Sequence, residues 1–137
     1  MKVVIDTNVL MAGILKEGIV RKVLLSSDVD FYIPDGGLSE VEKHIPELME
    51  KSKMSSSEIE QVILMLLEHI EIIPAEKVKE YFDEAVEIMR LIHLNDAPFI
   101  AGALAIKADG IWSFDEHFKK QMKVRLLSTR NLLDLNL

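Results

Sequence analysis

The chain contains no cysteine, which excludes disulfide bonds and thiolate metal sites and is expected of a protein in a reducing cytoplasm. It also lacks long apolar runs, since the longest, VILMLL (62–67), is far too short to cross a membrane. The first residues offer no signal-peptide core, because their apolar run stops at Asp6. These absences predict a soluble cytoplasmic protein without a membrane anchor.

The composition is that of a globular protein, with 49% hydrophobic and 28% charged residues, and a length of 137 residues predicts one domain covering residues 1–137. The net charge of −7 argues against nonspecific nucleic-acid binding through bulk charge. Residues 35–87 are strongly acidic, whereas residues 115–130 are basic. The basic segment is either a solvated face or a phosphate contact made by Lys119, Lys120 and Lys123.

Short runs of strand-forming residues alternate along the chain with stretches of helical periodicity. Strands are predicted at residues 2–5, 29–34, 70–74, 110–114 and 124–128. Helices are predicted at residues 20–27, 38–51, 55–70, 75–92 and 96–108. Strands separated by helices imply right-handed crossovers. The predicted fold class is therefore α/β, a three-layer α/β/α sandwich around a parallel sheet of about five strands.

The predicted helix 55–70 carries the clearest start signal in the chain. Its first residues allow two alternative capping boxes, Ser55 with Glu58 or Ser57 with Glu60. Apolar residues occupy so much of its circumference that both sides need to be covered. The covering surface is either the core of the same chain or a second copy in a homodimer.

Four acidic residues fall at or beyond the ends of predicted strands. Asp6 follows the first strand, Asp115 follows the fourth, and Asp96 opens the helix that leads into the fourth. Glu40 lies early in the helix that follows the second strand. Taken singly, each aspartate could be a helix cap and Glu40 a solvated residue. Ligands of parallel α/β sheets bind beyond the carboxyl ends of the strands, so the four acids can instead form one site.

Carboxylates gathered at one edge raise each other's pKa unless a cation neutralises them. Oxygen ligands without cysteine suit Mg²⁺, with Mn²⁺ as a possible substitute. The identity of the glutamate stays open, because its early position favours Glu40 whereas helical phase favours Glu42. His93 and His117 flank these residues and are expected to be surface or packing histidines, so no separate general base is predicted.

Three segments resemble the PIN domain family (PilT N-terminus type), which includes the VapC-like toxin ribonucleases. VVIDTNVL (3–10) is similar to the family's opening, in which the aspartate of D-T-N is a metal ligand. IPDGGLSEVEKHI (33–45) resembles a family segment whose spacing selects Glu40 over Glu42. NDAPFIAGALAIKADGIWSFDEHF (95–118) is similar to the family's run of aspartate, small-residue helix, strand and Ser/Thr-x-Asp. The resemblance as a whole covers essentially the whole chain.

The resemblance implies Mg²⁺-dependent hydrolysis of RNA phosphodiester bonds. It assigns four catalytic and metal-binding acids, Asp6, Glu40, Asp96 and Asp115, and two residues that orient them, Asn8 and Ser113. The basic residues that would contact the RNA backbone are Lys119, Lys120 and Lys123. The implied partners are an RNA substrate, a cognate antitoxin and a second copy in a homodimer. The predicted function is thus an endoribonuclease that is the toxin of a type II toxin–antitoxin system.

Other functions stay open on the sequence alone. A PIN nuclease could process RNA outside a toxin system, and a PIN-like module could bind RNA or protein without cutting it. A phosphoryl-accepting receiver domain also gathers acids at strand ends. It would show an acidic pair after the first strand and a lysine after the last, where this chain has DTN (6–8) and VRLLS (124–128). Divalent-dependent cleavage distinguishes the enzyme from the binding module.

Overall fold

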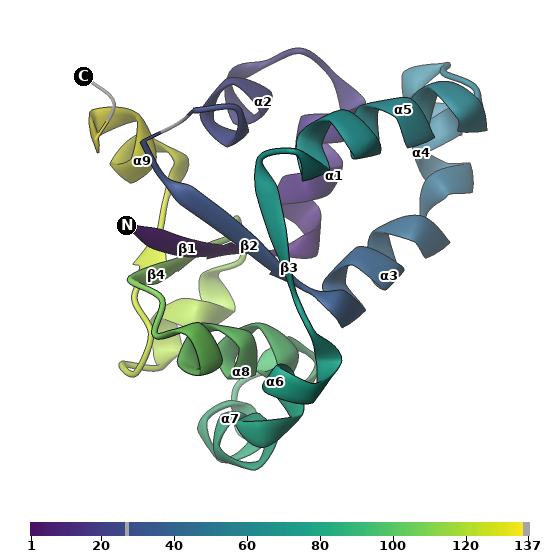
Figure 1. The fold of residues 1–137 in the computed structure, drawn as a ribbon. Coiled ribbons are helices and arrows are strands. Elements are labelled where there is room, and N and C mark those ends of the chain that lie inside the picture. Colours follow the sequence, from purple (N-terminus) through teal and green to yellow (C-terminus); the bar gives the residue numbers. More distant parts are fainter. Residues whose placement is uncertain (27, 136–137) are drawn as a thin grey trace.

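The computed structural model describes residues 1–26 and 28–135, which place a parallel sheet between two layers of helices (Figure 1). The strands in these residues are β1 (Lys2–Ile5), β2 (Asp30–Pro34), β3 (Ile70–Ile73), β4 (Gly110–Trp112) and β5 (Leu126–Leu127). All neighbouring strands pair in parallel, in the order β3-β2-β1-β4-β5. The predicted three-layer α/β/α sandwich is therefore confirmed.

The order of the strands reverses at β1. The chain adds β2 and β3 on one side of β1, then crosses over and adds β4 and β5 on the other. Strands β1 and β4 pair with Val3 opposite Gly110 and Ile5 opposite Trp112. In open parallel sheets, ligands bind beyond the carboxyl ends of the strands at such a reversal. Asp6 and Ser113, which directly follow β1 and β4, lie at this point.

The side chains of the strands alternate between the two faces of the sheet and so divide the core into two clusters. Val3, Ile5 and Trp112 belong to one cluster, whereas Val4 and Ile111 belong to the other. The first cluster includes residues of α1 (Thr7–Leu15), α2 (Ile19–Leu24), α3 (Asp35–Lys43), α4 (Ile45–Ser52), α5 (Ser56–Leu67) and α9 (Thr129–Leu135). The second includes residues of α7 (Phe82–Met89), α8 (Ala97–Ile106) and the 3₁₀ helix η2 (Glu116–Lys120). The short helix α6 (Ala75–Glu80) and the 3₁₀ helix η1 (Leu94–Asp96) complete this side.

Two helices that the sequence predicts as continuous are each broken into two. The predicted helix 38–51 is divided into α3 and α4 at His44. Pro46 accounts for the break, because a proline lacks the backbone N–H of a helix interior and is tolerated only in the first turn. The predicted helix 75–92 is divided into α6 and α7 at Tyr81, where the sequence has neither proline nor glycine. We have no physical account of this second break.

Helix α5 begins with the first of the two predicted capping boxes. Ser55 Oγ accepts from the N–H of Glu58 at 3.2 Å, and Glu58 Oε1 accepts from the N–H of Ser55 at 3.1 Å. The core of the same chain does not cover both sides of this helix, so cover by a second copy stays a prediction. Leu64 is 66% exposed and Met65 is 37% exposed, so one side of α5 presents apolar side chains to solvent.

Helices α1 and α9 have no counterpart in the sequence prediction. Helix α1 is apolar on almost every side, so its sequence shows no polar face by which to recognise a helix. Helix α2 ends at Leu24, whereas the predicted helix 20–27 extends to Ser27, which lies outside the described residues. Strands β4 and β5 are shorter than predicted. No helix in the described part of the chain combines the length and the apolar character needed to span a membrane.

Helix α8 packs unusually close to the sheet. A Cβ atom added to Gly102 would lie 3.1 Å from Pro34 Cγ and 3.2 Å from Ile73 Cδ1, so the side chains of Pro34 and Ile73 would have to shift to admit a larger residue. The neighbouring Ala101 and Ala103 are buried as well. This close packing holds Asp96, at the start of the helix, against the carboxyl edge of the sheet.

Candidate metal centre

Three of the four predicted acids meet beyond the carboxyl ends of β1 and β4. Asp6 and Asp96 are 6% and 9% exposed, whereas the side chain of Asp115 is 32% exposed at the rim of the cluster. Burial raises the pKa of Asp6, and the nearby charges of Asp96 and Asp115 raise it further. Hydrogen bonds from Ser113 and Thr7 act in the opposite direction, because they stabilise the ionised form. The cluster therefore holds negative charge in a site that favours its neutralisation.

Ser113 links two of these acids. Its Oγ donates to Asp6 Oδ2 at 2.6 Å and accepts from the backbone N–H of Asp115 at 2.9 Å. The N–H of Thr7 donates to Asp6 Oδ1 at 2.7 Å, so both oxygens of Asp6 are held in fixed directions. Asn8, the other predicted supporting residue, is exposed in the first turn of α1. Its side chain makes no hydrogen bond to any residue that the structure describes.

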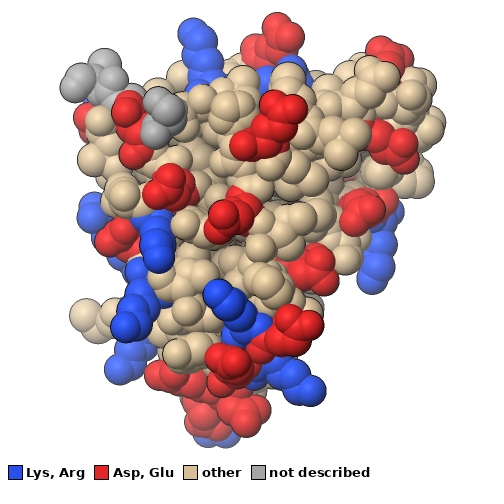
Figure 2. Space-filling view, in the orientation of Figure 1, with Lys and Arg blue, Asp and Glu red and all other residues tan. Residues whose placement is uncertain are grey.

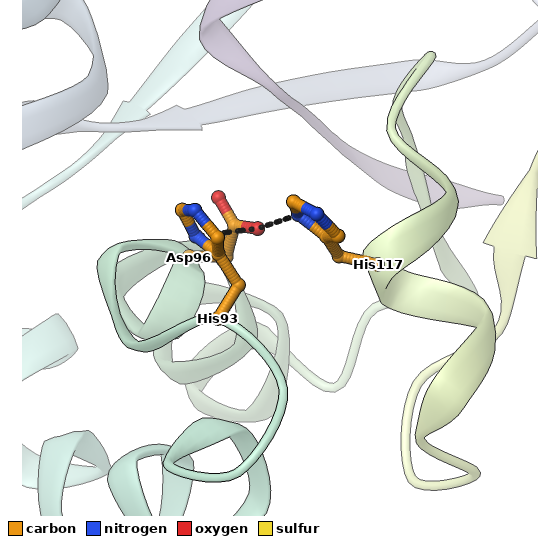
Figure 3. A group of neighbouring side chains, drawn as sticks. All are labelled: His93, Asp96 and His117. Carbon is orange, nitrogen blue, oxygen red and sulfur yellow. Dashed lines mark hydrogen bonds and ion pairs between the residues drawn. The ribbon is translucent and has the colours of Figure 1, made fainter.

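Two histidines complete the cluster around Asp96 (Figure 3). His93 Nδ1 and His117 Nδ1 each lie 3.4 Å from Asp96 Oδ2, and His117 Nδ1 lies 2.9 Å from Asp115 Oδ1. Burial raises the pKa of Asp96, while the two histidines lower it and Asp115 raises it. Both side chains are partly exposed, at 41% and 35%, and their rings stack, as expected of surface or packing histidines, but both also contact the buried carboxylate. The closeness of these histidines in sequence to Asp96 and Asp115 was the one feature that could have predicted this contact.

Glu40 does not contact these aspartates. Its side chain is 59% exposed on α3, with Oε1 3.7 Å from His44 Nε2. Within the described residues, no hydrogen bond or ion pair joins it to Asp6, Asp96 or Asp115. Glu42, the alternative, lines a hollow formed with residues of α5 such as Ile63. The two glutamates thus have different surroundings, and neither lies within the aspartate cluster.

One lysine of the basic segment, Lys119, lies close to Ser113. Lys119, at the end of η2, shares a hollow of about 560 Å³ with Ser113 and Arg130. Lys119 Nζ also pairs with Glu116 Oε2 at 2.6 Å, so part of its charge is balanced locally. The remaining two predicted substrate contacts, Lys120 and Lys123, are exposed.

The side chains at the centre fit a divalent cation. One ligand atom each from His93, Asp96 and His117 lie within 4.8 Å of one another. His93 Nδ1 is buried and lacks a hydrogen-bond partner within the described part of the chain. Buried polar atoms are normally paired, and buried like charges normally require a counter-ion. A cation bound among these groups would give His93 Nδ1 a partner and would neutralise the buried carboxylates.

Comparisons with known proteins agree with the fold. The PIN domain family matches residues 4–133. VapBC2 from Rickettsia felis, crystallised bound to a DNA fragment from their promoter, contains a similar chain with a TM-score of 0.74 at 19% identity, covering 93% of this chain and 98% of that one. For VapBC-1 from nontypeable Haemophilus influenzae the TM-score is 0.69 at 15% identity, covering 95% and 99%. Among curated proteins, no sequence matches this chain.

Proposed function

Because this chain belongs to the PIN domain family, we propose that it is a divalent-metal-dependent endoribonuclease and the toxin of a VapBC-like type II toxin–antitoxin system. The observation that carries the proposal is the cluster of Asp6, Asp96 and Asp115 at the reversal of the strand order, with Asp6 and Asp96 buried. A protein that gains nothing from burying repelling carboxylates would leave them in solvent. Perturbed acids at such a position mark functional sites.

The chain's residues have separate tasks in this proposal. Asp6 and Asp96 would hold the divalent ion, Mg²⁺ or Mn²⁺ in its place. Asp115 would complete its surroundings, and Glu40, which lies outside the aspartate cluster, would act through water. When bound, the ion supplies neutralisation of phosphate charge and activation of water. Ser113 and the N–H of Thr7 occupy one lone pair on each oxygen of Asp6. They thereby orient the carboxylate and leave its other lone pairs open.

RNA is the proposed substrate, although the surface is not broadly basic. Acidic and basic side chains are interspersed on the face shown in Figure 2, and acidic ones gather at its lower end in the region of α7. The metal therefore has to supply much of the attraction for phosphate at the centre. Lys119 adds positive charge in the hollow next to Ser113, which offers space for a nucleotide, and the exposed Lys120 and Lys123 are proposed as further contacts to the RNA backbone. RNA is then bound mainly at the metal site rather than along a broad basic surface.

Protein partners are part of the proposal. The two similar structures named above are of VapBC, and we infer a cognate antitoxin and a cytoplasmic location for this chain as well. Exposed apolar side chains on α2 and α5, Ile19, Leu64 and Met65, provide a surface for a second copy in a homodimer. Sedimentation of the wild type and of a Leu64→Glu variant tests the dimer, because a charge at its centre would dissociate it. A monomeric wild type would contradict this part.

The decisive experiment replaces Asp6 with asparagine. Asp6→Asn keeps the oxygen that accepts from Thr7, and asparagine caps helices about as well as aspartate, but one negative charge is lost. Mg²⁺-dependent cleavage of RNA should fall by more than the roughly 10–100-fold that loss of an outer-shell partner costs. The matched control is Asp109→Asn, at the opposite edge of the sheet. Full activity of the Asp6 variant would refute the proposed site.

A second comparison decides between the two glutamates. If Glu40 completes the metal surroundings through water, Glu40→Gln should lower the rate of RNA cleavage roughly 10–100-fold. Glu42→Gln should leave the rate unchanged, because Glu42 lies in the hollow against α5. Cleavage rates at saturating Mg²⁺ test both variants. The reverse pattern would transfer the role to Glu42, and no effect of either would restrict the site to the aspartates.

A further inference from the structure

The carboxylate at the centre of the site is flanked by two imidazoles as well as by other acids. His93 precedes η1 and His117 belongs to η2, so the two rings approach Asp96 from different segments (Figure 3). The rings are stacked, with centroids 4.4 Å apart and planes 14° apart. Both present Nδ1 to the same oxygen, Asp96 Oδ2.

The distances suit ligands of one ion better than direct hydrogen bonds. Each Nδ1 lies 3.4 Å from Asp96 Oδ2. Hydrogen bonds between nitrogen and oxygen usually measure about 2.7–3.2 Å. Two ligands at about 2.1 Å from a tetrahedral ion are themselves about 3.4 Å apart. The two nitrogen–oxygen separations thus match those around a shared ion, and all three ligand atoms lie within 4.8 Å of one another.

The buried nitrogen of His93 points to the same conclusion. His93 Nδ1 has no hydrogen-bond partner in the described part of the chain, although it is out of contact with solvent. Burying such an atom without a hydrogen-bond partner is unfavourable. His117 Nδ1 differs, because it lies 2.9 Å from Asp115 Oδ1 and has a partner. An ion would pair the first nitrogen and release any proton from the second to solvent.

We infer that His93, Asp96 and His117 bind a transition-metal ion of the Zn²⁺ class, through two Nδ1 atoms and one carboxylate oxygen. Mg²⁺ is bound almost entirely by oxygen, whereas imidazole suits Zn²⁺ and its neighbours in the first transition row. Two nitrogens among the ligands therefore favour Zn²⁺ over Mg²⁺. The inference rests on the proposed metal site but not on its use in RNA cleavage.

Zn²⁺ titration of the metal-free full chain tests this directly. The chain has 4 histidines, so their imidazole nitrogens can be followed individually by NMR and assigned by substitution. Zn²⁺ should shift the Nδ1 signals of His93 and His117 at stoichiometric concentration. His69, exposed before β3 at the other edge of the sheet, should not respond. A response confined to His44, which lies beside Glu40 and Glu47, would overturn the inference.

Calorimetry supplies the second readout. His93→Ala and His117→Ala should each weaken Zn²⁺ binding by more than the roughly 10–100-fold that loss of an outer-shell partner costs, whereas the control His69→Ala should leave it unchanged. Equal Zn²⁺ affinity in the double variant and the wild type would overturn the inference. RNA cleavage with Mg²⁺ is measured separately. Zn²⁺ binding without cleavage contradicts only the proposed function, and cleavage without an imidazole response contradicts only this inference.

Discussion

The acids at the amino ends of the strands (the amino edge of the sheet) and those at the carboxyl ends (the carboxyl edge) differ in how deeply they are buried. At the amino edge, Asp30 and Asp109 are exposed, and Asp109 Oδ2 accepts the N–H of Lys2 at 2.8 Å. At the carboxyl edge, Asp6 and Asp96 are buried next to further negative charge. An exposed carboxylate keeps its hydration and costs little, whereas a buried one is destabilised when it ionises. The metal-free chain therefore carries a cost at one edge that it avoids at the other.

The largest expected effect is that metal binding reverses this difference. A ligand that binds only the folded chain stabilises it by about 2.7 kcal/mol at 100 times its dissociation constant. Mg²⁺ or Mn²⁺ at that excess should raise the unfolding free energy of the wild type by this amount and that of Asp6→Asn by much less. Denaturant unfolding with and without metal measures both.

The amino edge supplies the control for this measurement. Asp109→Asn removes the same charge from an exposed position and should keep the full response to metal. If Asp6→Asn gains as much from Mg²⁺ as the wild type does, the ion does not bind at the carboxyl edge. If Asp109→Asn loses the response, the comparison between the two edges fails.

The meeting of the aspartates at one edge was predictable from the sequence. Strand-forming runs that end at Asp6 and just before Asp115, in a chain of alternating strands and helices, place both residues at the carboxyl ends of parallel strands. The structure brings them together through Ser113, as that topology requires. The apolar runs of the sequence indicate which strands are buried, and the points where those runs stop indicate where the strands end.

The histidines were not predictable in the same way. A single His93 or His117 belongs to no periodic pattern, and their contact depends on how η1 and η2 face each other after the chain has folded. Helix α1 was not predicted for a related reason, since its sequence is apolar on nearly all sides and shows no polar face. The contacts of the histidines and the recognition of α1 thus both depend on tertiary arrangement, whereas the role of Glu40 stays a prediction.

A smaller effect is expected from the lysines that border the carboxyl edge. Each phosphate contact with single-stranded RNA contributes about −0.7 to the slope of log affinity against log salt. Replacing three contacting lysines with alanine should therefore flatten the slope by up to about 2 and weaken binding at low salt. The substituted residues are Lys119, Lys120 and Lys123. Binding of a single-stranded RNA at several salt concentrations to a catalytically inactive Asp6→Asn background measures the slope.

A matched triple variant separates local contacts from net charge. It removes the same three charges from exposed positions elsewhere, at Lys16, Lys22 and Lys53. The slope should change less in this variant, because only lysines beside the site contact the RNA. Equal slopes in the two triple variants would return residues 115–130 to the role of a solvated face.

The smallest effect concerns the pH dependence of the metal-free chain. The pKa of Asp6 is raised in the folded state above its ordinary value of 3.8, chiefly by burial, so the folded chain binds this proton more tightly than the unfolded chain does. The stability that depends on the protonated carboxyl is thus fully present below pH 3.8 and is lost as the pH rises through the folded-state pKa. Asp6→Asn cannot lose a proton and escapes this loss.

In the presence of a chelator, Asp6→Asn should therefore melt close to the wild type at pH 3.5 or below, and above it at pH 7. The gap should open with rising pH, because only the wild type acquires a buried charge next to Asp96 and Asp115. Asp109→Asn, whose charge is exposed at the amino edge, should show no such widening. Melting curves of the three proteins across this range decide the matter. If the wild type without metal is as stable as Asp6→Asn at pH 7, the hydrogen bonds from Ser113 and Thr7 outweigh the effect of burial. The acids at the two edges would then not differ in their effect on the stability of the folded chain.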